Sequence, residues 1–240
     1  MYAVYSILMR ALVLSGGGLF GAWQAGAWSE AAKSFTPDLI VGCSVGSLNG
    51  YAIAAGATPD DLFAMWRDRE RASFDNLHGN LQKLAQQSLT RPFAITVTDI
   101  LRLRPRIFRD AEITWRHLAA SCAVPLALPQ VKIDGRWYTD GGLLNSLPVW
   151  AAVELGATEI LALDVLREFP NRWLRPAVSV FRALLGRKAT LPSGVKLITM
   201  APSQKLGNLR DTLRWKSENI ERWLALGAED IRNHFRPDMF

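Results

Sequence analysis

Residues 39–56 read LIVGCSVGSLNGYAIAAG, and this stretch divides into three parts. Leu39–Val41 is a short, fully apolar run, which predicts a buried β-strand. The glycine-flanked residues Gly42–Gly46 predict a tight turn, and Ser47–Ala55 predicts a helix that Gly56 ends. The stretch is therefore a strand, a turn and a helix in immediate succession.

The same pattern stands one unit earlier in the chain. Ala11–Leu14 is an apolar run that ends at glycines, and Leu19–Lys33 has helical character. Two consecutive strand–turn–helix units imply parallel strands, because each helix carries the chain back to the start of the next strand. The sequence thus predicts an α/β fold with a mainly parallel sheet.

Further elements follow along the chain. Thr58 is predicted to cap a helix that has Pro59 at its first position, and Asp134-Gly135 to form the turn of a hairpin over 131–138. We also predict strands at 93–98, 106–108, 159–165 and 195–199, and helices at 111–121, 148–155 and 208–235. Around the last helix, one buried face is predicted from the spacing of Leu206, Leu209, Leu213, Ile220, Leu224 and Ile231.

Composition and charge exclude several classes of protein. The 240 residues carry 28 Lys and Arg against 22 Asp and Glu, a net charge of +6, which favours anionic partners. The basic residues are spread out and no nucleic-acid-binding motif occurs, so we expect no nucleic acid partner. Cys43 and Cys122 lack metal-ligand spacing, so we expect reduced, buried thiols, no metal and no cofactor.

The N-terminus carries no clear targeting signal. No cation precedes the apolar run in residues 1–8 and no small-residue cleavage site follows it, so we expect a cytoplasmic protein. We predict a single domain over residues 9–240, with residues 1–8 as an N-terminal extension.

Ser44 is the candidate nucleophile. It lies at the centre of a G-x-S-x-G turn between a strand and a helix, where Gly42 and Gly46 allow the sharp bend that exposes the hydroxyl. A serine needs a base to take its proton. His78 and His234 have the surroundings of surface residues and His117 that of a structural residue, so a Ser-His triad is weakly supported, with Ser44 and His234 as its one open pairing.

Asp140 is the alternative base. It ends a predicted strand and is followed by Gly141 and Gly142, which allow another group to approach the carboxylate closely. A carboxylate with an ordinary pKa is a poor base, so this role requires desolvation. By itself, an Asp-Gly-Gly sequence is also a common turn.

The glycines of residues 14–26, LSGGGLFGAWQAG, could bind either a nucleotide phosphate or the oxyanion of an ester that is being cleaved. Gly16, Gly18 and Gly21 fit the G-x-G-x-x-G pattern of a dinucleotide-binding fold. That fold needs an acid at the end of its second strand, whereas Asp38 precedes the strand. The sequence therefore favours an oxyanion site over a nucleotide site.

Four blocks together resemble the patatin-like phospholipase family: SGGGLFGAWQAG, GCSVGSLNG, ASCAVPLALPQVKIDGRWY and DGGLLNSLPV, in the family's order from Ser15 to Val149. The resemblance implies a three-layer α/β/α sandwich and a Ser44–Asp140 dyad that cleaves acyl esters of lipids through an acyl-enzyme. It also implies an oxyanion hole formed by Gly16, Gly17 and Gly18. The family usually carries Arg or Lys where this chain has Phe20.

The resemblance implies a lipid ester substrate, either a phospholipid or a lysophospholipid. Residues 167–188 carry six basic residues and one acid, with apolar residues at helical spacing. This segment fits either peripheral contact with an anionic membrane or packing on the sheet. A catalytically silent lipid- or protein-binding member of the same fold is the alternative to an enzyme.

Overall fold

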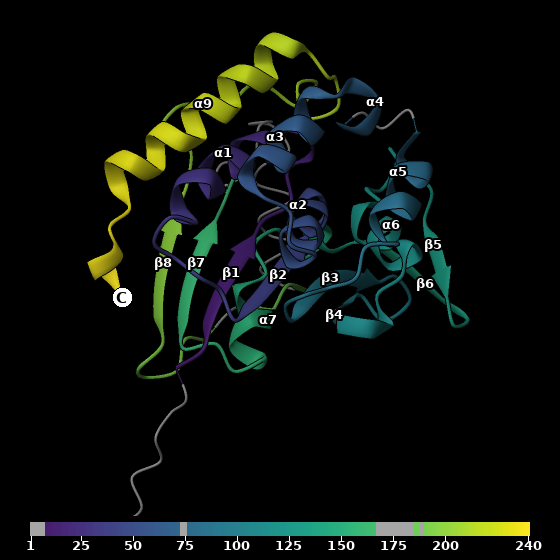
Figure 1. The fold of residues 1–240 in the computed structure, drawn as a ribbon. Helices are drawn as coiled ribbons and strands as arrows, with labels where there is room; N and C mark the ends of the chain where they lie inside the picture. Colours follow the sequence, from purple (N-terminus) through teal and green to yellow (C-terminus); the bar gives the residue numbers. More distant parts are fainter. Residues whose placement is uncertain (1–7, 73–75, 167–184, 188–189) are drawn as a thin grey trace, which may run out of the picture.

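The computed structural model describes residues 8–72, 76–166, 185–187 and 190–240 (Figure 1). Nearly all of the N-terminal extension and most of the basic segment 167–188 lie outside these residues. The predictions that concern them are therefore not addressed by the structure.

The described residues form one eight-stranded sheet in the order β5-β6-β3-β2-β1-β7-β8, with β4 paired to β3. Its strands are β1 (Arg10–Leu14), β2 (Leu39–Cys43), β3 (Phe93–Asp99), β4 (Arg104–Arg109), β5 (Val131–Ile133), β6 (Arg136–Asp140), β7 (Glu159–Leu163) and β8 (Lys196–Met200). β1, β2, β3, β7 and β8 pair in parallel, while β4, β5 and β6 join by antiparallel pairing. The predicted mainly parallel sheet is confirmed.

Helices cover both faces of this sheet. They are α1 (Gly21–Ala31), α2 (Val45–Ala54), α3 (Pro59–Arg67), α4 (Arg69–Ala72), α5 (Leu77–Leu84), α6 (Trp115–Cys122), α7 (Val149–Glu154) and α9 (Ser217–His234). Figure 1 shows α1, α2, α3 and α9 on one face, whereas α7 packs on β1, β2 and β7 from the other. The predicted three-layer α/β/α arrangement is confirmed.

β1 shows how one strand serves both layers. Leu12 and Leu14 belong to the core cluster beneath α1, α2 and α9, while Ala11 and Val13 belong to the cluster beneath α7. Successive side chains of a strand point to opposite faces, so a strand covered on both sides is apolar throughout. This explains the uninterrupted apolar runs in the sequence.

The order of the strands determines where a site forms. β1 lies between β2 and β7. The strands that follow β1 in the chain, β2 and β3, lie on one side of it, whereas the later strands β7 and β8 lie on its other side. In open α/β sheets, a crevice forms at the carboxyl ends of the strands where this order reverses. The glycines that follow β1 and the serine that follows β2 are at that edge.

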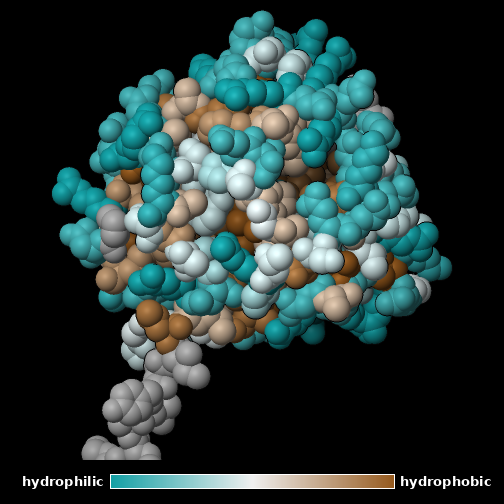
Figure 2. All heavy atoms as spheres, viewed as in Figure 1, coloured by the Kyte–Doolittle hydropathy of each residue, from teal (hydrophilic) through white to brown (hydrophobic). Residues whose placement is uncertain are grey.

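The predicted helix 208–235 is wrong in its first part. α9 begins at Ser217, and Leu209 and Leu213 are exposed instead of belonging to its buried face. Asp211 Oδ2 accepts a hydrogen bond from the Asn208 N–H, which favours a turn there. Ile220, Leu224 and Ile231 are buried as predicted, and Figure 2 shows hydrophilic residues along the outer edge of the molecule where α9 lies.

Candidate active site

The turn after β2 holds Ser44 in a strained conformation. Ser44 has φ 53° and ψ −128°, a region that L-residues rarely occupy and that costs about 1–3 kcal/mol. It precedes α2 without using its hydroxyl as a helix cap. Within the described residues, its Oγ makes no hydrogen bond, so the hydroxyl is available for reaction.

The glycines on either side of Ser44 are required by close backbone contacts. A Cβ at Gly42 would lie 2.4 Å from the Gly46 carbonyl oxygen, and one at Gly46 would lie 2.3 Å from the Leu14 oxygen. Both distances are shorter than a Cβ atom tolerates. The G-x-S-x-G pattern therefore allows α2 to begin directly against the ends of β1 and β2.

Ser121 fixes the serine turn from the other side. Its hydroxyl accepts a hydrogen bond from the Ser44 N–H at 2.9 Å and donates one to the Thr96 carbonyl at 3.0 Å. Ser121 is fully buried on α6. The sequence analysis missed this residue, although it lies in one of the four blocks, because its partner is 77 residues away.

Asp140 lies at the end of β6, where the chain turns. Its Oδ1 accepts a hydrogen bond from the Gly142 N–H at 2.6 Å, and its side chain is only 4% exposed. A Cβ at Gly141 would lie 2.5 Å from the Thr96 oxygen, so only glycine allows the chain to pass β3 this closely. The carboxylate is therefore largely shielded from water.

The register of the sheet places Ser44 and Asp140 at nearly the same height along the strands, on either side of β3. Cys43 pairs with Thr96 on β3, and the next residue of β3, Val97, pairs with Asp140 on β6. Ser44 and Asp140 are thus separated by two strand spacings, roughly 10 Å between backbones. Both residues line one cavity of about 750 Å³.

The walls of this cavity are mainly apolar. Val45 and Leu48 of α2, Trp66 of α3, and Leu81 and Leu84 of α5 line it. Its volume lies within the range of small-molecule sites, of about 300–1,000 Å³. The cavity therefore has room for an apolar chain beside the two reactive groups.

The glycine turn after β1 forms another wall of the cavity. Gly16, Gly17 and Gly18 all line it, and a Cβ at Gly16 would lie 3.1 Å from the Ser44 Cβ. The Gly16 N–H donates to the Ser146 carbonyl at 2.9 Å. Within the described residues, the N–H groups of Gly17 and Gly18 have no acceptor, so they are the donors left for a ligand.

Phe20 and Gly21 follow the glycine turn in the chain, where α1 begins. Phe20 is buried, with its ring edge-on against Trp223 of α9 at 5.1 Å. The residue that replaces the family's usual cation therefore contributes to the core. Gly21 lies so close to Val45 and Trp66 that a Cβ would clash with both side chains.

Asp38 has no part in this site. Its carboxylate accepts a hydrogen bond from the Arg10 N–H at the start of β1, the opposite end of the strand from Gly16. A ribose-binding acid is needed beside the glycine turn. The structure therefore gives no support to the dinucleotide alternative.

The three histidines lie outside the cavity. His78 and His234 are exposed, as predicted, and none of the three lines the cavity. His117 is buried, and its Nδ1 accepts a hydrogen bond from the Thr114 N–H at the start of α6. The structure gives no support to the pairing of Ser44 with His234.

The role of His117 predicts a pH dependence of folding. Burial lowers its pKa, and the capping hydrogen bond requires its neutral form. The unfolded chain then binds a proton more readily, so stability falls as the pH drops below about 6.5. We expect His117→Gln, which retains an acceptor for Thr114, to lose less stability than the wild-type chain.

Urea unfolding midpoints of the two proteins at about pH 7.5 and about pH 5.5 measure this difference. An equal loss of stability in both proteins would contradict the assignment.

A buried polar network connects the glycine turn to the cavity wall. Gln24 Nε2 donates to the Ser15 carbonyl, and Asn49 Nδ2 donates to Gln24 Oε1 and to the Gly21 carbonyl. Trp66 Nε1 donates to Asn49 Oδ1 at 3.0 Å. Asn49 thus connects α1, α2 and α3, and the sequence analysis missed both amide residues.

We expect Asn49→Leu to destabilise the fold by about 3 kcal/mol, because Trp66 Nε1 and Gln24 Oε1 would lose buried partners. Chemical denaturation measures the loss. Asn233→Leu, at an exposed position near the end of α9, is the matched control and should change stability by less than about 0.5 kcal/mol. Similar losses in both variants would show that the network contributes little.

Neither cysteine forms a disulfide, and both are buried, as predicted. Cys122 lines the cavity, where burial and the nearby Asp140 carboxylate raise the pKa of its thiol far above the usual range. A protonated thiol is a poor nucleophile. Within the described part of the chain, no cluster of three His, Cys, Asp or Glu side chains is placed to hold a metal ion.

Comparison with models of protein families shows which family the chain belongs to. The model of the patatin-like phospholipase family matches residues 12–98 and 80–153, together more than half of the chain. The chain belongs to the patatin-like phospholipase family. This is a family of lipid acyl hydrolases, and the matched region contains the glycine turn, Ser44 and Asp140.

Several relatives are much longer proteins. The chain is 29% identical over 225 residues to patatin-like phospholipase domain-containing protein 7 of Rattus norvegicus, covering 81% of this chain and 16% of that protein. It is 28% identical over 178 residues to lysophospholipase nte1 of Aspergillus oryzae, covering 64% of this chain and 12% of that protein. The chain thus spans between about an eighth and a sixth of these patatin-like relatives.

A solved structure shows the same fold. VipD from Legionella pneumophila superposes with a TM-score of 0.59 at 14% sequence identity, covering 94% of this chain and 66% of that one. At this identity the likeness concerns the patatin-like fold alone.

Proposed function

We propose that this chain is a serine acyl hydrolase that cleaves fatty acyl ester bonds of phospholipids or lysophospholipids. The observation that carries the proposal is that Ser44, Asp140, Gly17 and Gly18 all line one mainly apolar cavity, and that the Gly17 and Gly18 N–H groups have no acceptor among the described residues. The family assignment supports the same reaction.

In the proposed first step, Asp140 takes the proton of the Ser44 hydroxyl as Oγ attacks the ester carbonyl carbon. The N–H groups of Gly17 and Gly18 donate to the oxyanion that forms. Fixed donors of this kind stabilise the charge without reorganising, and each is worth about 3 kcal/mol. In this proposal Gly16 supports the turn instead of donating to the oxyanion, because its N–H donates to the Ser146 carbonyl.

The tetrahedral intermediate then collapses. The ester C–O bond breaks, and the leaving alcohol takes the proton from Asp140, which leaves an acyl-enzyme on Ser44. Asp140 next takes a proton from water as the water attacks this acyl ester. The fatty acid departs and Ser44 recovers its proton.

A panel of defined esters tests the proposal. It contains a lysophosphatidylcholine, a diacyl phosphatidylcholine, and nitrophenyl esters of a short and a long fatty acid. We expect hydrolysis, and the apolar cavity favours the long-chain ester over the short one. If the folded protein hydrolyses none of them, the silent binding protein becomes the better account.

We further infer a single domain over residues 9–240, a cytoplasmic location and peripheral contact with an anionic membrane. Within the described residues, every helix is too short or too polar to cross a bilayer.

A further inference from the structure

The segment between β8 and α9 runs across the mouth of the cavity. We call residues 206–216 the strap. Leu206 is buried, and its carbonyl accepts hydrogen bonds from Arg222 and from Trp223 Nε1. At the other end of the strap, Trp215 Nε1 donates to the Trp66 carbonyl at 3.1 Å.

The middle of the strap is joined to the glycine turn. The Thr212 carbonyl accepts a hydrogen bond from the Leu19 N–H at 2.8 Å. Gly18, at φ +57°, lies so close that a Cβ would be 2.3 Å from the same oxygen. The strap is therefore held at both ends and at its centre, directly over the donors proposed for the oxyanion.

Two leucines of the strap point outward between these anchors. Leu209 is 41% exposed and Leu213 is 49% exposed, and both line the cavity. A residue that is exposed and also lines the cavity lies at its mouth. These are the two leucines that the sequence analysis wrongly assigned to a buried helix face.

A second apolar segment, residues 124–128, also reaches the mouth of the cavity. Val124, Pro125, Ala127 and Leu128 line the cavity, and Leu126, between them, is fully exposed. Leu126 has a positive φ of 68°, a conformation that is uncommon for leucine, and its side chain is open to solvent. Exposed apolar residues of two segments therefore lie at the opening.

The strap itself carries a net positive charge. Arg210, Arg214 and Lys216 are exposed, against the single acid Asp211. Within the described part of the chain, these three side chains take part in no ion pair or hydrogen bond. An apolar rim beside these cations complements a lipid surface that has acyl chains below anionic headgroups.

We propose that the strap and residues 124–128 form the surface by which this protein docks on an anionic lipid bilayer, with the mouth of the cavity facing the lipid. This inference rests on the proposed function, because it gives the acyl chain a direct route from the bilayer to Ser44. The basic segment 167–188 is not needed for it.

The first experiment measures binding and needs no activity. The full chain and the variant Arg210→Gln/Arg214→Gln are floated with vesicles of phosphatidylcholine containing phosphatidylserine, and with vesicles of phosphatidylcholine alone. Each basic residue near such a surface contributes about 1 kcal/mol, so we expect the double variant to bind anionic vesicles about thirtyfold more weakly.

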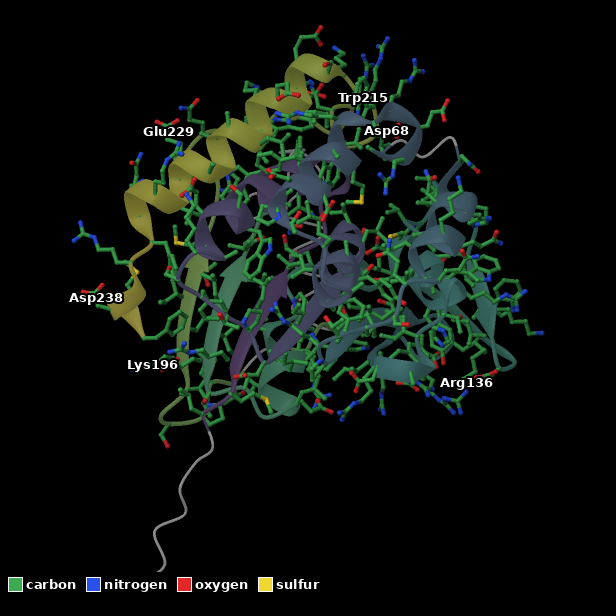
Figure 3. All side chains as sticks on the ribbon, viewed as in Figure 1. Asp68, Arg136, Lys196, Trp215, Glu229 and Asp238 are labelled. Carbon is green, nitrogen blue, oxygen red and sulfur yellow. The ribbon has the colours of Figure 1, made fainter. Side chains whose placement is uncertain are left out.

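The matched control removes two charges elsewhere. Arg91→Gln/Lys196→Gln changes exposed residues at the amino ends of β3 and β8, the opposite edge of the sheet from the cavity, and Figure 3 shows Lys196 far from Trp215. We expect it to bind as the wild-type chain does. If both double variants lose vesicle binding equally, net charge alone explains the loss and the proposal is overturned. If neither variant loses vesicle binding, the proposal is overturned as well.

A second pair of variants tests the apolar rim. We expect Leu126→Asp to weaken binding to anionic vesicles by at least about fivefold, because a charge replaces an inserting side chain. Leu101→Asp, at another strongly exposed leucine in the β3–β4 turn, is expected to have no effect. Binding by Leu126→Asp equal to that of Leu101→Asp would contradict the proposed surface.

Hydrolysis separates the two proposals. For the strap variants we expect the rate on vesicle phospholipid to fall relative to the rate on a soluble short-chain ester. If the wild-type chain hydrolyses neither substrate yet floats through the strap, the proposed function fails and the docking surface stands. If it hydrolyses both and the strap variants keep the same ratio of rates, the docking surface fails and the proposed function stands.

Discussion

Ser44→Ala is expected to lower kcat for ester hydrolysis by on the order of 10⁴-fold or more, because no other group in the cavity replaces the nucleophile. The Cys122 thiol lines the same cavity but stays protonated. The change removes only a hydroxyl that makes no hydrogen bond within the described residues, so the fold should tolerate it. Initial rates on the best ester of the panel measure the loss.

The control for this prediction is Ser34→Ala. Ser34 is exposed beyond the end of α1, so its replacement should leave the rate unchanged. Circular dichroism confirms that both variants are folded. A Ser44→Ala protein that keeps a tenth or more of the wild-type rate would exclude Ser44 as the nucleophile.

Asp140→Asn is expected to lower kcat by on the order of 10³-fold, the contribution of a positioned general base. The amide oxygen of asparagine still accepts the Gly142 N–H, so the turn after β6 keeps its geometry. The amide cannot take the Ser44 proton. We therefore expect the loss to fall on kcat, with little change in KM.

Asp134→Asn provides the matched control, because Asp134 is exposed at the tip of the β5–β6 hairpin, where asparagine is equally well tolerated. Its rate should equal that of the wild-type chain. If Asp140→Asn raised KM and left kcat unchanged, Asp140 would contribute to binding and another base would have to be found.

The local parts of the site were predictable from the sequence. The turn at Ser44 follows an apolar strand and opens a helix, and this order alone positions a serine at the carboxyl edge of the sheet. Asp140 with its two glycines is likewise a local signal. Thr58 and the Asp134-Gly135 turn were predicted for the same reason, because capping and turn preferences act over a few residues.

The rest depends on contacts between distant residues. Nothing near Ser44 indicates that Ser121 fixes its backbone, or that Ser146 occupies the Gly16 N–H. The leucines at 209 and 213 kept a helical spacing although they belong to the strap. Spacing shows that residues share a side of the chain, and it does not distinguish a protein core from the mouth of a cavity.

The most direct test of the account is to label the protein with a fluorophosphonate and locate the adduct by mass spectrometry. This reagent reacts with serines that are activated as nucleophiles beside an oxyanion site. The account predicts one adduct per chain, on the peptide that contains Ser44, and none in Ser44→Ala. An adduct on another residue, or no adduct on a folded chain that hydrolyses esters, would contradict it.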